Sequence, residues 1–291
     1  MGRILCVGSI NADYIYRVPH LPAPGETLNA ASMTRMLGGK GANQSIAASL
    51  SGADVAHLGA IGVGDDWLIA ALQGRGVDTQ SVAMIDMPTG HAIINVDDAG
   101  ENAIVLFPSA NHSVPSHMLS DKISEYGVGD ICLLQNEITI SAEAAAQAKS
   151  AGMTVVYSAA PFSPDAVKEI LPHADLLVMN EIEARDLSKS LNMDPNDLPC
   201  DVLVTRGADG SAYYGKQKIN AGAFKVMAID TTGAGDCYIG AFSAKRANGA
   251  SVEEALRWAA AASAIQVSRA GTADAMPTKA EIEAFLKDRD Q

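Results

Sequence analysis

From residue 130 onward, short apolar runs alternate regularly with helix-forming segments. The runs cover residues 131–134, 155–158, 176–179 and 202–205, and the helical segments cover residues 141–151, 164–171 and 181–191. This alternation is typical of a parallel sheet with helices packed on both faces. We therefore predict an α/β fold built on a doubly wound, mostly parallel sheet. In such sheets, ligands bind beyond the carboxyl ends of the strands.

The N-terminal part of the chain follows a different pattern. After a short buried strand at residues 4–7, extended segments occur at about 14–37 and 88–108, and the second contains a hairpin turn at residues 97–100. Two such ribbons predict a small β-sheet that stands off the main body as a lid and keeps water from a reaction. Because the chain has no evident linker or internal repeat, we expect residues 1–291 to form one domain.

Composition narrows the class of ligand. Of the 291 residues, 48% are hydrophobic and only 5% aromatic, and the formal net charge is −13. An acidic chain of this kind does not favour nucleic acid or an anionic membrane as a partner. The four cysteines lack C-x-x-C spacing, and the sequence has no signal peptide or membrane-span pattern, so we expect reduced thiols and a cytoplasmic location. An anion site must then be built locally, from backbone N–H groups, a few cations and a metal ion.

The stretch Asp230 to Asp236 is the best candidate for such an anion site. It follows an apolar run at residues 224–229, which we predict to be a strand, and it precedes helix-forming residues that continue to Ala247. The backbone around Gly233, Ala234 and Gly235 leaves room for a ligand, because glycine lacks a side chain and adopts conformations closed to other residues. The N–H groups of a helix's first turn have no partner within the helix and favour an anion.

Asp236 lies among these N–H donors. It can take a proton from an attacking hydroxyl group while the N–H groups hold the charge of a transferred phosphoryl group. The alternative is that Asp236 only stabilises its own helix, as acidic residues do near a helix N-terminus. Its neighbour Cys237 is either a nucleophile or a small residue at a helix start.

Two further stretches can bind hydroxyl groups. Asn11 and Asp13 are two residues apart, so in an extended segment they face the same side and can grip two hydroxyls of a polyol; the alternative is an Asx turn. The run Gly38 to Gln44 lacks the spacing of a P-loop, but its glycines let a small ligand lie against the backbone while Asn43 bonds a hydroxyl. The Gly-rich turn at residues 62–66 lacks the third glycine of a dinucleotide-binding fingerprint, which we reject.

Polar residues also follow the strands of the predicted parallel sheet. Asn180 and Glu183, three apart at a helix start, can hold the waters of a Mg²⁺ ion, or they can form an N-cap with an acidic first turn. Glu137, after an earlier strand, is either a cap or a ligand group, and Thr205 ends a further strand.

Five motifs resemble, in the same order along the chain, those of the ribokinase family of sugar kinases: residues 8–13, 24–27, 38–44, 180–183 and 230–236. The likeness runs from about residue 4 to residue 285, and the Gly-Gly-Lys-Gly-Ala-Asn-Gln run is closer to the ribokinase branch than to the fructokinase or nucleoside-kinase branches. The resemblance implies a β-sheet lid that is often shared across a homodimer. It also implies ATP-dependent phosphorylation of a sugar's terminal hydroxymethyl group, with Mg²⁺ and stimulation by a monovalent cation, usually K⁺.

The resemblance also implies a role for each matching residue. Asp236 would be the general base, and the backbone from Thr232 to Gly235, which includes Gly233 and Ala234, would form the anion hole. The sugar would be held by Asn11, Asp13, Gly39, Lys40, Asn43 and Glu137. The nucleotide and magnesium side would be lined by Asn180, Glu183, Thr205, Gly207 and Gly210. The monovalent cation would be bound, largely through backbone oxygens, by the loops containing Asp230, Thr232, Arg269 and Gly271.

A few positions depart from the family pattern. Ala275 replaces a hydroxyl residue near the cation, Ala260 replaces a polar residue beside the adenine, and Cys237-Tyr238 replaces Thr-Phe after the base, while residues 191–201 form a shortened segment. We expect ribose as the substrate, with 2-deoxyribose next. Another sugar or a nucleoside is the alternative substrate. A non-catalytic sugar-binding regulator is the function we favour least, because Asp236 and the glycine run are both intact.

Overall fold

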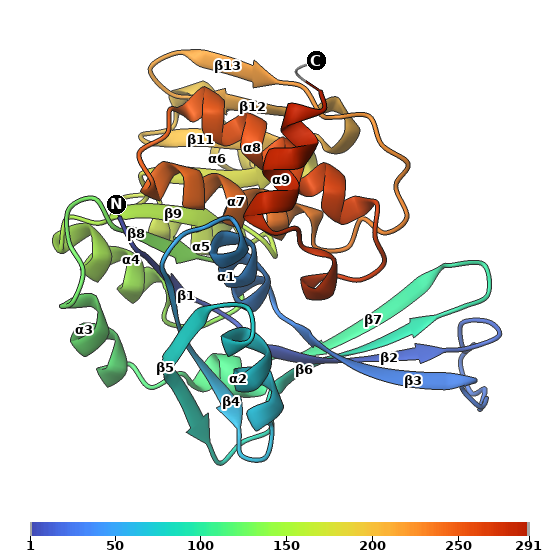
Figure 1. Cartoon of the computed structure of the whole chain (residues 1–291). Coiled ribbons are helices and arrows are strands. Elements are labelled where there is room, and N and C mark those ends of the chain that lie inside the picture. The colour runs from blue at the N-terminus through green and yellow to red at the C-terminus, as the bar shows by residue number, and fades with distance from the viewer. Residues whose placement is uncertain (1, 290–291) are drawn as a thin grey trace.

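The computed structural model describes residues 2–289 and has the α/β architecture predicted above. A large, mostly parallel sheet is covered by helices on both faces, and a second, smaller sheet projects from one side of this body (Figure 1). Among the described residues, no helix is both long enough and apolar enough to cross a membrane.

The large sheet has nine strands within residues 2–289, in the order β13-β12-β11-β10-β9-β8-β1-β4-β5. Neighbours from β11 to β5 are parallel, whereas β12 and β13 extend the sheet as an antiparallel edge. The strands are β1 (Ile4–Val7), β4 (Val55–Gly62), β5 (Val77–Ile85), β8 (Ile131–Leu134), β9 (Thr154–Ser158), β10 (Leu176–Asn180), β11 (Asp201–Thr205), β12 (Ser211–Tyr214) and β13 (Lys218–Ala221).

The small sheet has the order β3-β2-β6-β7. Its two ribbons, β2–β3 and β6–β7, are each antiparallel, and β2 and β6 join them in parallel. The strands are β2 (Asn11–Arg17), β3 (Ser32–Gly38), β6 (Gly90–Val96) and β7 (Asn102–Phe107). Because β2 follows β1 after only three residues, the small sheet emerges from the middle of the large one (Figure 1).

The helices form two layers because alternate strand residues point to opposite faces of the large sheet. In β1, Ile4 and Cys6 pack toward the layer of α1, α2, α7, α8 and α9, and Leu5 and Val7 toward the layer of α3 to α6. The helices are α1 (Lys40–Leu50), α2 (Asp66–Gln73), α3 (His117–Ile123), α4 (Ser141–Ser150), α5 (Pro164–Ile170), α6 (Glu181–Leu191), α7 (Ala234–Ala247), α8 (Val252–Val267) and α9 (Lys279–Lys287), with short 3-10 turns η1 (Ser109–Ser113), η2 (Pro195–Asp197), η3 (Gly207–Asp209) and η4 (Ala273–Ala275).

The prediction of a strand at residues 224–229 is wrong. After β13 the chain leaves the sheet and crosses to the helical layer without pairing to another strand. Phe224 packs edge-on against Phe285 of α9, and the N–H of Ile229 donates to the carbonyl of Val267 at the end of α8 (2.7 Å). The apolar side chains of this run are used to dock a connection on helices, which a short apolar run does not distinguish from a strand.

Several strands were not predicted from the sequence. β4 and β5 lie between the two ribbons and complete one half of the large sheet, and β12 and β13 form its antiparallel edge. Within the extended segment expected at about 14–37, strand β2 ends at Arg17 and β3 begins only at Ser32.

The close packing of α1 against α7 positions the polar residues at their N-termini. Gly240 of α7 faces the backbone of α1, and a Cβ atom there would lie 2.4 Å from the Gln44 carbonyl oxygen and 2.7 Å from the Ala47 Cβ atom. The oxygen belongs to the helix backbone and the Cβ atom is bonded directly to it, so neither can move aside cheaply.

We therefore expect Gly240→Ala to destabilise the protein by about 1–3 kcal/mol, because the added methyl group overpacks the contact between the helices. Urea unfolding would measure the change. Gly127→Ala is the matched control, since a Cβ at that position would have only an ordinary contact of 3.7 Å. Equal stability of the Gly240 and Gly127 variants would contradict the close approach of α1 and α7.

Candidate active site

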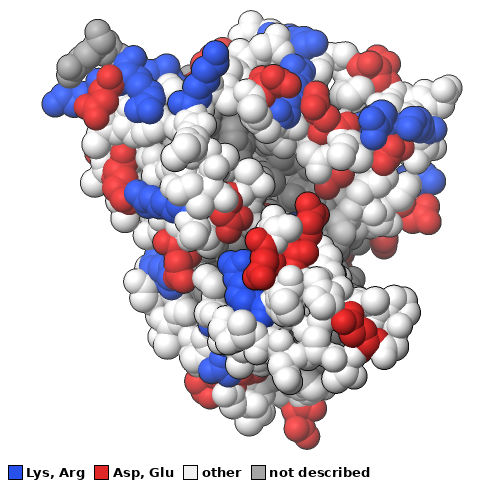
Figure 2. All heavy atoms as spheres, turned by 90° about the vertical axis from the view of Figure 1, so that its right-hand side faces the viewer, with Lys and Arg blue, Asp and Glu red and all other residues white. Residues whose placement is uncertain are grey.

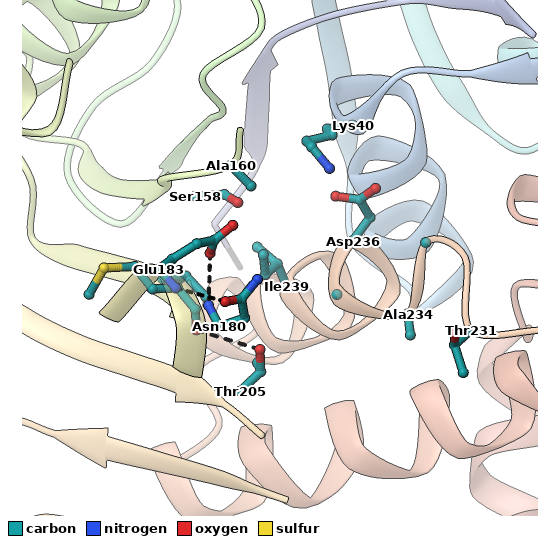
Figure 3. A pocket seen from close by; sticks show the side chains of 14 residues that line it. Lys40, Ser158, Ala160, Asn180, Glu183, Thr205, Thr231, Ala234, Asp236 and Ile239 are labelled. Carbon is teal, nitrogen blue, oxygen red and sulfur yellow. Dashed lines mark hydrogen bonds between the residues drawn. The ribbon is translucent and has the colours of Figure 1, made fainter. Parts of the chain in front are cut away.

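A cavity of about 230 Å³ opens at the carboxyl ends of the central strands, where ligands of parallel sheets bind. Its walls come from the ends of β9, β10 and β11 and from the N-terminal residues of α1, α6 and α7. Figure 3 shows the Lys40 ammonium and the Asp236 carboxylate turned toward each other at one side, with Asn180, Glu183 and Thr205 at the other. The lining residues are Lys40, Ser158, Ala160, Val178, Met179, Asn180, Glu183, Thr205, Thr231, Gly233, Ala234, Gly235, Asp236 and Ile239.

The N-terminus of α7 forms one wall of this cavity. Gly233 precedes the helix with a φ of 76°, in the left-handed region that glycine adopts without strain, and no side chain caps the helix. The first-turn N–H groups of a helix have no acceptors within it, and the macrodipole adds positive potential there. The wall formed by Gly233, Ala234 and Gly235 is therefore suited to an anion, as the sequence predicts.

The buried carboxylate of Asp236 is held by two amide side chains of α1. Gln44 Nε2 donates to Oδ1 at 2.9 Å and Asn43 Nδ2 donates to Oδ2 at 3.2 Å. The Asp236 carboxylate raises the pKa of Lys40, and the Glu137 and Glu183 carboxylates act in the same direction, whereas burial acts to lower it. Lys40 therefore stays positively charged beside Asp236. The Oδ1 atom of Asn43 is buried without a partner among the described residues, so its acceptor remains available to a ligand.

Glu137 anchors the start of α1. Its Oε2 atom accepts hydrogen bonds from the Lys40 backbone N–H (3.0 Å) and from the Ser9 hydroxyl group. Burial raises the pKa of Glu137, while Lys40 and the two hydrogen bonds act against that rise. Both predicted roles of Glu137 are thus compatible, since Oε2 holds a helix end and Oε1 has no hydrogen-bond partner among residues 2–289.

Asn11 and Asp13 lie in β2 at the root of the small sheet, two residues apart and therefore on one face. The Asn111 side chain orients Asn11: its Nδ2 atom donates to Asn11 Oδ1 (2.7 Å), and its Oδ1 atom accepts from the Ile10 N–H (3.0 Å). Asp13 lies over Gly38, where a Cβ would be 2.0 Å from Asp13 Oδ2. Burial, reinforced by the Glu137 carboxylate, raises the pKa of Asp13 to about 7, and its Oδ1 atom has no partner among residues 2–289.

Asn180 and Glu183 form a capping box at the start of α6. Asn180 Oδ1 accepts from the N–H groups of Ile182 and Glu183 (both 2.9 Å), and Glu183 Oε2 accepts from the Asn180 N–H (2.8 Å). Both residues also line the cavity, where Figure 3 shows them beside Thr205. The N-cap interpretation is therefore correct as local structure, and it leaves the remaining side-chain atoms for a ligand. Burial raises the pKa of Glu183.

Gly207 begins the short turn η3 just beyond Thr205 and Gly210 follows it, with φ values of 53° and 87°. Gly210 also lies close to the chain after β13, because a Cβ there would be 2.1 Å from the Ala221 carbonyl oxygen. Neither glycine lines the cavity itself, but both follow Thr205, which does.

The predicted cation loops meet beside the N-terminus of α7. Asp230 accepts from the N–H groups of Thr232 (2.9 Å) and Gly271 (3.0 Å). Although burial acts to raise it, these hydrogen bonds lower the pKa of Asp230. The Arg269 guanidinium is instead committed to Glu281 (2.6 Å) and the Ala275 carbonyl, so only its backbone can serve an ion. Within residues 2–289, no group of three or more His, Cys, Asp or Glu side chains could hold a metal ion.

Several residues of the site were missed by sequence reasoning. Ser158 ends the apolar run of β9 and lines the cavity, and Gln266 donates to the carbonyls of Thr232 (2.9 Å) and Gly271 (3.2 Å). Their signal was weak, because Ser158 lies inside an apolar run and Gln266 within an alanine-rich helix. Burial raises the pKa of the Cys237 thiol to about 12, which argues against a nucleophilic cysteine.

The face toward which the small sheet projects is hollowed between that sheet and the body, and acidic and basic side chains are interspersed across it (Figure 2). The cavity at the ends of the strands therefore belongs to a partly covered site rather than to a flat surface.

Comparison with known proteins agrees with this geometry. A family model described as pfkB family carbohydrate kinase matches residues 1–279. The chain is 36% identical to a ribokinase of Haemophilus influenzae, with 99% of each chain covered, and 31% identical to a ribokinase of Bacillus subtilis, with 98% of this chain and all of the relative covered.

Solved structures share the fold over nearly the whole length. A ribokinase from Thermotoga maritima aligns with a TM-score of 0.89 and 34% identity, covering 99% of this chain and 100% of that one. A ribokinase from Arabidopsis thaliana, solved in complex with ribose and ATP, aligns with a TM-score of 0.87 and 30% identity, covering 99% of both chains. With the family model matching more than nine-tenths of its length, the chain belongs to the pfkB family of carbohydrate kinases.

Proposed function

We propose that the protein transfers the γ-phosphoryl group of ATP to the terminal hydroxymethyl group of D-ribose, giving ribose 5-phosphate. The observation that carries the proposal is the buried Asp236 carboxylate at the uncapped N-terminus of α7, facing Lys40 across the end of a cavity. Full-length relatives that are ribokinases, one of them solved with ribose and ATP, support this choice of substrate and nucleotide.

In this proposal Asp236 is the general base. It takes the proton of the sugar hydroxyl as the hydroxyl oxygen attacks the γ-phosphorus and the bond to the β-phosphate oxygen breaks. The N–H groups at the start of α7 belong to residues that line the cavity, and they stabilise the charge on the transferred group, apart from that of Ala234, which donates to the Thr231 carbonyl (3.2 Å). Lys40, which remains protonated, adds a positive charge at the same end of the cavity.

The opposite wall suits the nucleotide and its metal ion. Asn180, Glu183 and Thr205 present oxygen atoms there, the ligand type that Mg²⁺ and its waters prefer. Magnesium, when bound with ATP, neutralises the negative charge that builds up on the phosphates. Gly207 beside this wall leaves the backbone accessible to the nucleotide, since a Cβ there would meet nothing within 4 Å, whereas the space beside Gly210 is filled by the chain at Ala221.

The loops at Asp230, Thr232 and Gly271 suit a monovalent cation such as K⁺. They offer an ionised carboxylate and carbonyl oxygens, and the two carbonyls converge on one amide group, that of Gln266. Because Thr232 directly precedes Gly233, an ion here would steady the anion site. Ala275 supplies no side-chain oxygen at the position where the family pattern has a hydroxyl residue.

Asn11 and Asp13 are the proposed sugar-binding pair. Asn111 occupies the Oδ1 atom of Asn11, whereas the Nδ2 donor of Asn11 has no partner within residues 2–289. Asp13 adds an acceptor on the same face, its Oδ1 atom, which is likewise unpartnered in the described part of the chain. A donor beside an acceptor matches two neighbouring hydroxyl groups of a sugar, and Asn43 Oδ1, the backbone of Gly39 and Glu137 complete the surroundings.

The small sheet is proposed to act as a lid and as the contact surface of a homodimer. β7 is exposed along its whole length, and Ile104 (52% exposed) and Leu106 (56%) share the face that carries Asp13. Apolar side chains grouped on a projecting sheet favour burial against another protein surface. A cytoplasmic location accords with the free thiols of all four cysteines.

We expect purified protein with Mg·ATP to release ADP when D-ribose is added, and more slowly or not at all with 2-deoxyribose, fructose or adenosine. Asp236→Asn should lower kcat by about 10²–10⁴-fold with ribose affinity retained, because the variant keeps the shape but loses the base. A coupled ADP assay with and without K⁺ measures both. If Asp236→Asn turned over as fast as the parent protein, Asp236 would not be the base. Turnover with adenosine alone would show that the substrate is a nucleoside and not ribose.

Folding stability should fall with rising pH in part because of Asp13. Its pKa is about 7 in the folded protein and near 3.8 when unfolded, so the folded state binds the proton more tightly. The stabilisation is complete below the lower value and is lost as pH rises through about 7. In urea unfolding at acidic and alkaline pH, Asp13→Asn should flatten this dependence, and exposed Asp121→Asn should not. Identical slopes for the parent and Asp13→Asn would contradict the buried carboxyl.

The parent protein should be a dimer that Leu106→Asp converts to monomers, because a charge on the shared apolar face prevents its burial. Analytical ultracentrifugation measures the mass. Val128→Asp, at an exposed position away from the lid, is the control. A dimer that survives Leu106→Asp would exclude this face as the contact.

A further inference from the structure

We propose that Gln44, itself held by Gln135, is a positioning residue that sets the orientation of the Asp236 carboxylate for proton transfer. The inference rests on the proposed function, since it assigns the two amides to the base of that reaction. Neither glutamine lines the cavity, so their effect passes through Asp236.

The three side chains form a continuous buried series across three elements. Gln135, directly after β8, donates from Nε2 to Gln44 Oε1 in α1 at 2.8 Å. Gln44 then donates from Nε2 to Asp236 Oδ1 in α7 at 2.9 Å. Gln44 and Gln135 are both 0% exposed and Asp236 is 7% exposed, so water cannot readily replace either amide.

The carboxylate determines the direction of both amides. An ionised carboxylate only accepts hydrogen bonds, so Gln44 must turn its NH₂ group toward Asp236. Its carbonyl oxygen is then left facing Gln135, which must in turn present an NH₂ group. A reversed Gln44 would place an amide oxygen against Asp236 Oδ1, and Gln135 prevents this reversal by occupying the oxygen on the other side.

The absence of a side chain at Gly8 makes room for the Gln135 amide. A Cβ at Gly8 would lie 2.2 Å from Gln135 Oε1, so only glycine at that position lets the Gln135 amide take its place. The Oε1 atom has no partner among the described residues, which is unfavourable for a buried polar atom. A purely apolar filling would avoid this cost, which favours a functional reason for the amide.

The series complements the bond from Asn43. With Gln44 on Oδ1 and Asn43 on Oδ2, the plane of the carboxylate is fixed by two neutral donors from one helix. Asp236 lines the cavity, so its remaining lone pairs are available to a hydroxyl group bound there. The other charged side chains that act on this region are Lys40, Glu137 and Glu183, and the variants below leave them unchanged.

The test uses the full chain with Mg·ATP and D-ribose. Gln44→Met keeps the length of the side chain and removes the donor, so kcat should fall about tenfold or more while the KM values for ribose and ATP change by less than about threefold. Gln135→Met frees the Gln44 amide to turn, and kcat should fall in the same direction by a smaller factor. Gln73→Met, which breaks a glutamine bond to Thr79 far from the cavity, should keep the parent's kcat.

The pH profile separates positioning from a merely structural role. Gln44→Glu places a second carboxyl group beside Asp236, and like charges at this distance favour protonation of the pair. The base works only when ionised, so the acidic fall in kcat should begin at higher pH, by about one unit or more. Loss of stability alone would lower the amount of active enzyme without moving the profile, and ADP-binding stoichiometry corrects for that amount.

A kcat for folded Gln44→Met within about twofold of the parent, or an unmoved profile for folded Gln44→Glu, would overturn the inference. If Gln44→Glu does not fold, the kcat values of Gln44→Met and Gln135→Met decide whether the positioning role holds.

Asp236→Asn is assayed beside these variants. An inactive Asp236→Asn with normal Gln44 variants rejects only the positioning role, whereas an active Asp236→Asn rejects the base and its positioning together.

Discussion

The contact between α1 and α7 is the constraint on which the site depends. Gly240 allows the two helices to approach until a Cβ would be only 2.4 Å from the Gln44 carbonyl oxygen. That approach brings the amides of α1 within hydrogen-bonding distance of Asp236, and it turns Lys40 toward the same carboxylate. A wider separation would leave a buried carboxylate without donors, which is costly in a protein interior.

Charge is concentrated at this point although it is unfavourable there. Glu137, Glu183 and Asp236 act on one lysine, Lys40, and Glu137 also acts on Asp13. Burial raises the pKa of Asp13, Glu137 and Glu183. Groups with perturbed pKa values in a cleft are typical of functional sites. In the proposed reaction, the hydroxyl groups of the sugar would donate hydrogen bonds to the carboxylates, and magnesium would add positive charge. The free protein therefore holds acceptors that bound ligands would satisfy.

Much of the fold followed from local patterns. The strands at 131–134, 155–158, 176–179 and 202–205 and the helices between them were predicted because each element was long enough and bounded by turn residues. The prediction for residues 224–229 failed because their apolar side chains pack on helices. β4 was missed because glycine, alanine and histidine dilute the apolar pattern of VAHLGAIG, and β5 because adjacent polar residues interrupt that of VDTQSVAMI. Pairing to a neighbouring strand is a non-local property that such patterns do not contain.

The sequence by itself determined the chemistry of the site: a glycine turn before a helix, an aspartate in its first turn, a lysine in a glycine-rich run, and the Asn-x-Asp and Asn-x-x-Glu pairs. Local backbone preferences and side-chain chemistry are encoded within a few residues. Only the tertiary structure decided which of these groups meet. Gln44 and Asp236 are 192 residues apart, and Arg269 turns to Glu281 rather than to the cation loop. Such contacts depend on how helices pack on a sheet, because packing selects one partner from many that local sequence allows.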